Sequence, residues 1–323
     1  MAENPISAFL DDLSGVTSHV AFRFLIFNQI LYHQFLGFHL LKPSFKKAAG
    51  GAPANVSVCI AKLGGSAAFI GKVGEDEFGH MLANMLKENK VNNSGVRFDP
   101  VARTALAFVT LRADGEREFM FSVIRVLTCF CGSPNLILIE EPCRSTQLAA
   151  MSIAKKSGSL LSYDPNLRLA LWPSGDAARK GIMSIWDQAD IVKISEEEIS
   201  FLTEGADPQD DNLVLKKLFH PNLRLLLVSE GKAGCRYYTK QFKRRVSAIK
   251  VKPIDTNGAG DAFMGAVLYC LASDVNLIQD EKRLREALFF ANACGALTVT
   301  KNGAIPALPT KDAIQKIMAE ASA

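Results

Sequence analysis

Residues 255–261 read Asp255-Thr256-Asn257-Gly258-Ala259-Gly260-Asp261, and the apolar stretch 262–268 follows them directly. Small residues that open a helix leave several backbone N–H groups free to face one anion, with the positive end of the helix dipole behind them. Asp261 would stand beside that anion in the first helical turn. The segment therefore predicts an electrostatic cradle and a base in one place, which is the pairing that phosphoryl transfer needs.

A second glycine-rich segment opens another predicted helix, and it reads Gly50-Gly51-Ala52-Pro53-Ala54-Asn55-Val56-Ser57. Paired glycines allow a ligand to approach the backbone closely, and Pro53 favours a first helical turn. Asn55 offers both a donor and an acceptor to a hydroxyl group. The helix is expected to run to about Leu63, with Gly64 as a left-handed C-cap.

Each segment also has a purely structural explanation. Asp-Thr-Asn-Gly is good turn chemistry, and an Asp in a first helical turn stabilises the helix by ~0.3–1 kcal/mol. The second segment resembles an ordinary capped helix. Together, and in this order, the two strings resemble the signatures of the ribokinase-like (PfkB) sugar kinases. The resemblance implies an α/β fold with a doubly wound, mostly parallel sheet flanked by helices, and a small β lid that is truncated here.

The pattern along the chain fits such a fold. Short apolar runs predict strands at 67–73, 159–163, 191–194 and 223–229, with a helix at 77–90. Alternation predicts a half-exposed strand at 104–111, and Asp114-Gly115 a hairpin turn into 118–121. This two-stranded piece belongs to a lid around 96–121. Ligands in doubly wound sheets lie beyond the carboxyl ends of the parallel strands.

From Phe45 to Pro309, with one gap, the chain resembles the fructokinases of plants and related bacteria. The strings that carry this finer resemblance are Glu141-Pro142-Cys143-Arg144-Ser145, Asp164-Pro165-Asn166-Leu167-Arg168, Leu171-Trp172-Pro173-Ser174 and Phe201-Leu202-Thr203-Glu204-Gly205. The resemblance implies ATP-dependent phosphorylation of D-fructose to fructose 6-phosphate. A related sugar kinase of different specificity is an alternative.

The resemblance also implies roles for the residues of both signatures. Asp261 would be the general base that deprotonates the primary hydroxyl of the sugar. The amides of Gly258, Ala259 and Gly260 would hold the developing charge of the γ-phosphate. Gly51 and Asn55 would contact the sugar.

The nucleotide site is implied by resemblance alone. Ser229, Gly231 and Gly234 match a strand and turn that line this site in relatives, and Asn292 matches a helix position that faces the adenine. The chain contains no Gly-x-x-x-x-Gly-Lys-Ser/Thr motif. Phosphate binding would therefore rely on a helix N-terminus.

Two ions are implied in the same way. Asp255 and Thr256, together with the segment around Gly303, match a loop that holds potassium in many relatives. Glu198 matches a glutamate linked to Mg²⁺, usually through water. Ser195-x-x-Glu198 is equally a capping box at a helix start, and the sequence leaves both interpretations open.

The chain departs from the family pattern in two places. Residues 1–43 do not match, so the kinase domain is expected to span 44–315. After Phe121, residues 122–131 bridge directly where relatives continue with more of the lid. Because a lid excludes water during transfer, the chain is expected to bind nucleotide but to phosphorylate fructose weakly. A catalytically silent, kinase-like interaction protein is the alternative from another class.

Composition narrows the remaining possibilities. The chain has 323 residues, of which 48% are hydrophobic, and a net charge of only +4, so nothing points to a nucleic acid partner. Polar residues interrupt the apolar stretch 20–41, which disfavours a membrane span. Seven cysteines without regular spacing, Cys129 and Cys131 among them, indicate reduced thiols and a cytoplasmic protein. The sequence leaves open whether the protein forms a homodimer.

Overall fold

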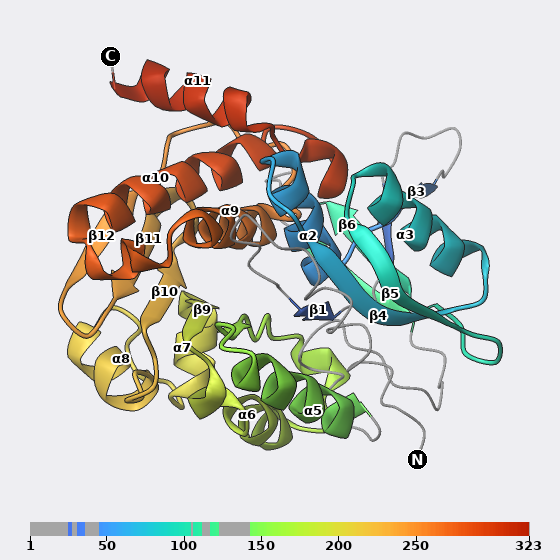
Figure 1. Ribbon diagram of the computed structural model, residues 1–323, viewed down its shortest axis with the longest axis horizontal. Coiled ribbons are helices and arrows are strands. Elements are labelled where there is room, and N and C mark those ends of the chain that lie inside the picture. The colour runs from blue at the N-terminus through green and yellow to red at the C-terminus, as the bar shows by residue number, and fades with distance from the viewer. Residues whose placement is uncertain are drawn as a thin grey trace.

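The computed structural model describes residues 25–27, 31–35, 45–104, 106–111, 117–122 and 143–322 (Figure 1). The strands of this part are β1 (Leu25–Phe27), β2 (Leu31–Phe35), β3 (Phe45–Ala48), β4 (Ala68–Gly74), β5 (Asn92–Asp99), β6 (Leu106–Leu111), β7 (Arg117–Ser122), β8 (Ser162–Tyr163), β9 (Ile191–Ser195), β10 (Leu225–Ser229), β11 (Gly234–Tyr238) and β12 (Lys243–Ser247). The strands form three sheets with helices packed around them, which is an α/β architecture.

The α-helices of the same residues are α2 (Ala52–Lys62), α3 (Glu77–Glu88), α5 (Cys143–Lys156), α6 (Gly175–Met183), α7 (Glu196–Leu202), α8 (Asp211–Leu218), α9 (Ala259–Ser273), α10 (Glu281–Thr298) and α11 (Lys311–Ser322). Short 3₁₀ turns are η2 (Leu169–Leu171), η3 (Trp186–Gln188), η4 (Gly231–Ala233), η5 (Val275–Gln279) and η6 (Ile305–Ala307).

A five-stranded sheet has the order β12-β11-β10-β9-β8. Strands β8, β9 and β10 run parallel, whereas β11 and β12 are antiparallel to their neighbours. The strands predicted at 159–163, 191–194 and 223–229 are confirmed as β8, β9 and β10. Ser195 at the end of β9 pairs with Ser229 at the end of β10. The segments that follow these parallel strands therefore begin at one edge of the sheet.

Strand β10 separates two apolar cores. Leu225 and Leu227 belong to a core built with α2, α9 and α10, and Leu226 and Val228 belong to a second core built with α6, α7 and α8. Successive side chains of a strand point to opposite faces, so both faces of the sheet are covered, as the doubly wound prediction requires. Figure 1 shows α9 and α10 on one side of strands β9–β12 and α7 and α8 on the other.

A three-stranded parallel sheet has the order β1-β4-β5. Helix α3 packs against β4 and β5 and buries Leu82 and Leu86, and it confirms the helix predicted at 77–90. Helix α2 begins after Gly51 and ends at Lys62, and Gly64 beyond it has a left-handed φ of 92°. The predicted helices and the predicted C-cap are therefore confirmed here.

A four-stranded sheet has the order β3-β2-β6-β7. Strands β6 and β7 pair antiparallel, from Leu106 opposite Ser122 to Leu111 opposite Arg117, which confirms the predicted hairpin. Its turn at 114–115 lies outside the described residues. Strands β2 and β3, which the sequence did not predict, extend the hairpin into a larger sheet. Its role as a lid stays a prediction.

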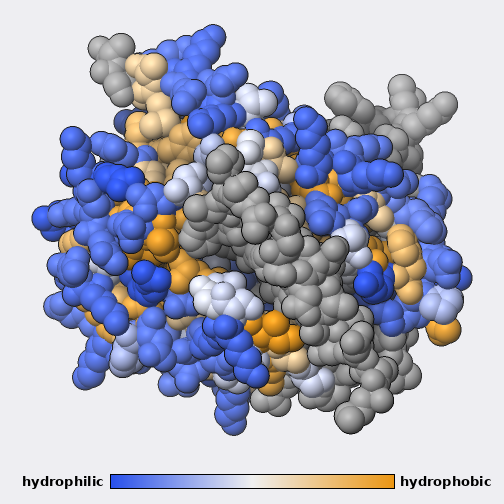
Figure 2. All heavy atoms as spheres, in the orientation of Figure 1, coloured by the Kyte–Doolittle hydropathy of each residue, from blue (hydrophilic) through white to orange (hydrophobic). Residues whose placement is uncertain are grey.

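Several expectations concern the surface and the thiols. Within the part of the chain that the structure describes, no helix is both long enough and apolar enough to cross a bilayer. Cys59, Cys235, Cys270 and Cys294 are free thiols, whereas Cys129 and Cys131 lie outside the described residues. Figure 2 shows hydrophilic residues over most of the described surface on this face.

Asp99 at the end of β5 organises the loop that follows it. Its Oδ1 accepts hydrogen bonds from the amides of Val101 and Ala102 at 2.9 and 2.8 Å, and its carboxylate forms an ion pair with Lys72. The hydrogen bond from Lys72, assisted by the two amides, lowers the pKa of Asp99 to about 2. The unfolded chain would titrate near ~3.9, so the charged form stabilises the fold.

This lowered pKa gives a pH dependence with a definite sign. The stability from Asp99 is complete above the unfolded pKa of ~3.9 and is lost as the pH falls toward the folded pKa. The variant Asp99→Asn should be less stable than the wild type at pH 5, and the difference should shrink at pH 3. Urea unfolding at both pH values measures it. The exposed Glu320→Gln variant is the control, and an unchanged difference would contradict the assignment.

Candidate active site

The N-terminus of α9 lies at the centre of the site. Gly258 is its N-cap and adopts a left-handed φ of 76°, and no side chain caps the helix. The first helical hydrogen bond runs from the amide of Ala262 to the carbonyl of Gly258 at 2.8 Å. The backbone amides of Gly260 and Asp261 come before Ala262 in the chain and take no part in that bond. The arrangement is a helix N-terminus of the kind that binds anions.

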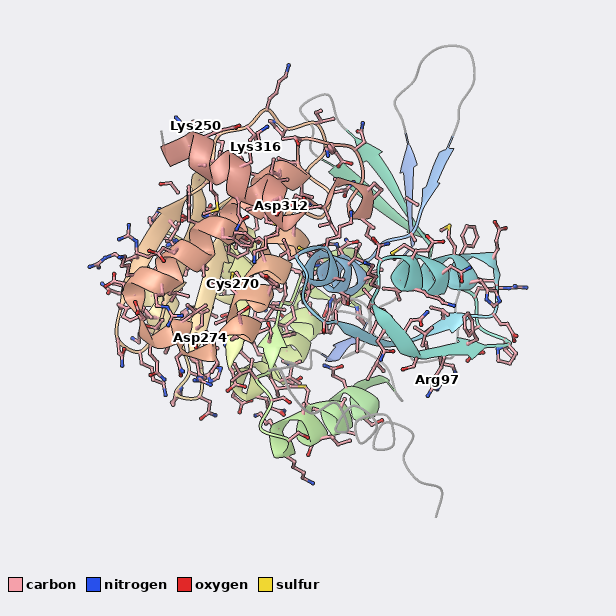
Figure 3. All side chains as sticks on the ribbon, turned by 45° about the horizontal axis from the view of Figure 1, so that its top comes forward. Arg97, Lys250, Cys270, Asp274, Asp312 and Lys316 are labelled. Atoms are coloured by element: carbon pink, nitrogen blue, oxygen red, sulfur yellow. The ribbon has the colours of Figure 1, made fainter. Side chains whose placement is uncertain are left out.

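Gly258 is required for a second reason besides its backbone angle. A Cβ placed on it would lie 2.7 Å from the Cβ of Ala304, which is closer than two carbon atoms pack. The glycine therefore allows the loop before α9 to contact the segment before η6. At the opposite end of the helix, Cys270 and the C-cap Asp274 are labelled in Figure 3.

Helix α2 brings Asn55 to the same place. The Asn55 Nδ2 donates a hydrogen bond to the Asp261 Oδ2 at 2.7 Å, although 206 residues separate the two in the chain. A Cβ on Gly265 would lie 2.7 Å from the Cβ of Cys59, so the two helices touch where α9 has no side chain. This close packing sets the distance between Asn55 and Asp261, because both residues lie one turn before the contact.

Asn55 is fully buried, and its side chain is only half satisfied. Its Nδ2 binds Asp261, while its Oδ1 has no hydrogen-bond partner in the described part of the chain. A buried acceptor without a partner costs about 1–3 kcal/mol, and contact of this oxygen with a sugar hydroxyl stays a prediction. Gly51 is the N-cap of α2, with a φ of 119°, and its carbonyl accepts the Asn55 amide at 2.8 Å. Both residues predicted to contact sugar therefore line one end of α2.

The loop before α9 is closed by Asp255, which is fully buried. Its Oδ1 accepts the amide of Asn257 at 2.9 Å, and its Oδ2 accepts the amide of Gly303 at 2.7 Å. The carbonyl of Thr256 accepts the amide of Ala259 at 3.4 Å. The structure thus joins the two segments that the resemblance assigned to potassium, and their occupancy by an ion stays a prediction.

Glu198 is part of a complete capping box at the start of α7. Its Oε2 accepts the Ser195 amide at 2.8 Å, and the Ser195 hydroxyl accepts the Glu198 amide at 3.2 Å. Its Oε1 accepts the amide of Leu167 at 2.7 Å. The structural interpretation of Ser195-x-x-Glu198 is therefore confirmed. A role of Glu198 toward a metal stays a prediction, and it would have to act beside these bonds.

The turn after β10 contains the three residues assigned to the nucleotide. Ser229 ends the strand, Gly231 begins η4, and Gly234 follows η4 as the first residue of β11. The two glycines have φ values of 55° and 108°. A Cβ on Gly234 would lie 2.1 Å from the carbonyl oxygen of Val246, so the turn requires a glycine there. The three residues lie at the sheet edge where β9 also ends.

Arg236 holds this turn against α8. It is 1% exposed, its Nε lies 2.7 Å from the Glu230 Oε1, and its NH2 group donates to the carbonyl of Pro208 at 2.7 Å. Its NH1 lies 3.2 Å from the Asp211 Oδ1. Burial raises the pKa of Glu230, although the charge of Arg236 opposes the shift. Sequence patterns gave no signal for this buried ion-pair network.

Asn292 lies on α10, where its Nδ2 donates to the carbonyls of Val246 and Ser247 at 2.9 and 3.3 Å. These bonds fix α10 to strand β12. Asn292 is therefore a structural contact in this conformation, and its predicted position opposite an adenine stays a prediction.

One buried ion pair near this site was not predicted from the sequence. Lys193 lies in the middle of β9, and its Nζ is 3.0 Å from the Asp164 Oδ2. Burial lowers the pKa of Lys193, but the charges of Asp164 and Glu198 outweigh it, so the pKa is raised. Burial also raises the pKa of Asp164 to about 6, against the charge of Lys193. A lysine inside an apolar strand run was the signal that could have identified this pair.

The structure brings part of the predicted residues together around the start of α9. Asp261, Gly258, Ala259 and Gly260 form the start of α9, and Asn55 bonds to Asp261. Gly51, Asp255 and Thr256 lie on the segments that adjoin this centre. Glu198, Ser229, Gly231 and Gly234 lie at or just after the ends of β9 and β10, and the described bonds of Asn292 turn to β12.

Comparison with known proteins identifies the class. The family model described as "pfkB family carbohydrate kinase" matches residues 29–311, and the chain belongs to this family. It is 65% identical over 292 residues to probable fructokinase-7 of Arabidopsis thaliana, which covers 85% of each chain. It is 56% identical over 295 residues to fructokinase-1 of Oryza sativa subsp. japonica, which covers 86% of this chain and 91% of the relative.

Solved structures agree with this membership. A Vibrio cholerae O395 fructokinase with bound fructose, ADP and calcium is 32% identical, with a TM-score of 0.79 over 92% of this chain and 99% of that chain. A Xylella fastidiosa fructokinase with bound ATP is 31% identical, with a TM-score of 0.81 over 94% of this chain and 100% of that chain. The ribokinase-like fold is thereby confirmed.

The close contact at Gly258 can be tested against a matched glycine. Gly258 and Gly64 both have left-handed backbone angles, but nothing lies within 4 Å of a Cβ on Gly64. The variant Gly64→Ala should lose about 1–2 kcal/mol of unfolding free energy from backbone strain alone. The variant Gly258→Ala should lose at least ~1 kcal/mol more, because Ala304 must shift. Urea unfolding measures both, and equal losses would contradict the close contact.

Proposed function

We propose that this chain is an ATP-dependent fructokinase, which transfers the terminal phosphoryl group of ATP to D-fructose and produces fructose 6-phosphate and ADP. The observation that carries the proposal is the Asn55–Asp261 hydrogen bond of 2.7 Å beside the uncapped N-terminus of α9. It joins a residue assigned to the sugar with the residue assigned as the general base, at the helix start that is assigned to the phosphate. Similarity to plant fructokinases over most of the chain supports fructose as the sugar.

The residues present fit this reaction. The amides of Gly258, Ala259 and Gly260 would receive the γ-phosphate oxygens, where the helix dipole favours negative charge. Asn55 Nδ2 fixes the Oδ2 of Asp261, and the unpartnered, buried Asn55 Oδ1 would accept a hydrogen bond from a sugar hydroxyl. Such fixed groups act without reorganisation at the moment of reaction.

The proposed step balances in atoms and charge. The 6-hydroxyl oxygen of fructose attacks the γ-phosphorus, the new O–P bond forms, and the bond from γ-phosphorus to the β,γ-bridging oxygen breaks. Asp261 accepts the hydroxyl proton, and ADP leaves with the electron pair of the broken bond. The first turn of α9 stabilises the charge that develops on the phosphoryl oxygens.

Two ions belong to the proposal. Mg²⁺ neutralises phosphate charge when it is bound, and Glu198 would hold it through water, because both Glu198 oxygens already accept backbone amides at 2.7 and 2.8 Å. Potassium would lie at the loop of Asp255 and Thr256. Vibrio cholerae fructokinase structures with calcium and with potassium support a cation requirement of this kind.

Ion removal gives a direct test of both assignments. Chelation of Mg²⁺ by EDTA should abolish fructose phosphorylation, and added Mg²⁺ should restore it. Replacing KCl by LiCl at constant ionic strength should lower turnover, because the smaller lithium ion does not suit the same loop. A coupled assay for ADP measures both effects. Equal turnover in KCl and LiCl would remove potassium from the proposal and leave Mg²⁺ unaffected.

The variant Asp261→Asn tests the base. It keeps the size of the side chain but cannot accept the hydroxyl proton, so turnover should fall about 10²–10⁴-fold. ATP binding should stay within about threefold of the wild type, because the amides of α9 are unchanged. The matched control is Asp312→Asn, since Asp312 also lies in the first turn of a helix but is exposed on α11 (Figure 3).

The same assay measures the sugar and the predicted impairment. D-fructose, D-glucose, D-ribose and D-tagatose should be compared at matched concentrations, and preference for a sugar other than fructose would overturn the substrate assignment. The wild-type turnover, measured beside the rice relative, tests the prediction that residues 1–43 and the gap after 121 weaken the reaction. A wild type with no activity on any sugar, but with normal ATP binding, would favour a silent kinase-like protein.

Two further predictions concern the whole protein. We propose a cytoplasmic location, although probable fructokinase-6 of Arabidopsis thaliana, which is 62% identical over 296 residues, is described as chloroplastic. A homodimer also stays a prediction. The partners that the proposed reaction requires are a sugar, ATP and the two ions, and it involves no nucleic acid.

A further inference from the structure

Lys193 lies beside Gly260, in the first turn of α9, which the proposed function assigns to the phosphate. A Cβ on Gly260 would be 3.3 Å from the Lys193 Nζ and 3.9 Å from its Cε. Lys193 shares a face of β9 with Ile191, whose side chain belongs to the core beneath α9. The alternation of the strand therefore directs the ammonium group toward the start of that helix. Its side chain is only 9% exposed.

Several carboxyl groups act on Lys193. Asp164 contacts it at 3.0 Å, and the charges of Glu198 and Asp261 also act on it. Asp164 is therefore in direct contact with Lys193, and two further carboxyl groups act on it electrostatically. Asp164 Oδ1 is buried and has no hydrogen-bond partner in the described part of the structure. A buried pair of this kind is expensive to desolvate and adds little stability by itself, which makes a functional reason for it more plausible than a structural one.

Phosphoryl transfer supplies such a reason. The chain has no P-loop lysine, because its sequence contains no Gly-x-x-x-x-Gly-Lys-Ser/Thr motif. Transfer enzymes place a cation on the terminal phosphoryl group, where negative charge is spread over three oxygens. Lys193 is a cation beside Gly260, the residue whose amide is assigned to those oxygens.

We propose that Lys193 is a further catalytic residue, whose ammonium group contacts the terminal phosphoryl group of the nucleotide, and that Asp164 is the positioning residue that holds it below α9. The inference rests on the proposed function. Lys193 is paired with Asp164, and the incoming phosphoryl oxygens become additional acceptors. Lys193 transfers no proton in this step. It stabilises the phosphoryl oxygens while the bonds to phosphorus exchange.

The decisive experiment compares two nucleotides that differ in the terminal phosphate. Binding of the non-hydrolysable ATP analogue AMP-PNP and of ADP, each with Mg²⁺, is measured by calorimetry on the full chain. The variant Lys193→Met should weaken AMP-PNP binding about 10-fold to 100-fold, the range expected for a charge-assisted hydrogen bond. ADP binding should change less than about threefold. The variant Lys193→Arg should recover part of the loss.

A matched control exists in the same fold. Lys72 in β4 also pairs with an aspartate, Asp99, and belongs to the other parallel sheet. The variant Lys72→Met should leave the ratio of AMP-PNP to ADP affinity unchanged. Because Lys193→Met leaves Asp164 buried without its partner, the double variant Lys193→Met/Asp164→Asn is measured beside it. It removes both charges and should show the same loss of AMP-PNP binding.

The two nucleotides distinguish a contact with the terminal phosphate from a general disturbance of the site. Equal weakening of AMP-PNP and ADP by the double variant would overturn the proposal, because it would show a general disturbance of the site. Unchanged binding of both nucleotides would also overturn it. The variant Asp164→Asn should lower kcat for fructose more than it changes the KM for fructose, as a positioning residue would. If fructose proves to be the wrong sugar, the nucleotide measurements still decide the role of Lys193.

Discussion

The packing of α2 against α9 is the constraint on which the site depends. Gly265 has no side chain at the point where Cys59 approaches, and this absence lets the helices touch. One turn away, the contact places the Asn55 amide 2.7 Å from the Asp261 carboxylate. Two segments that are far apart in the chain thereby meet at one site. Fixed geometry of this kind replaces the random encounter of sugar and phosphate, which is where much of the catalytic advantage of such enzymes arises.

The charged groups near the start of α9 are placed there by the parallel strands of the five-stranded sheet. Parallel strands β8, β9 and β10 end at one edge, and the segments that follow them supply Asp164, Glu198 and the turn of Gly231. The backbone amides at this edge and at the start of α9 are hydrogen-bond donors, whereas Asp164 and Glu198 contribute carboxyl groups. Lys193 reaches the same place from within β9. The hydrogen-bond donors that this site offers therefore include the backbone amides and the ammonium group of Lys193.

Local patterns in the sequence were enough to predict the helices that carry Asn55 and Asp261. The small residues 257–260 and the Pro53 helix start have local causes, so their helices and the Gly64 cap were predictable. Contacts between distant segments were not. The Lys193–Asp164 pair and the Arg236 network depend on which strands become neighbours. Asn292 has a helical position that resembles a nucleotide contact, but the nearby β12 carbonyls take its amide. Strands β2 and β3 had no comparable local signal.

Strand β10 has an implication for how the gene could vary. Its side chains serve two cores in alternation, Leu225 and Leu227 toward one and Leu226 and Val228 toward the other. An insertion of a single codon inside this strand would reverse the assignment for every later position and shift the pairing with β9. Edge strand β12, where four of five residues are exposed, has no such twofold duty. Length changes during evolution should therefore accumulate at the rim of the sheet and spare its middle.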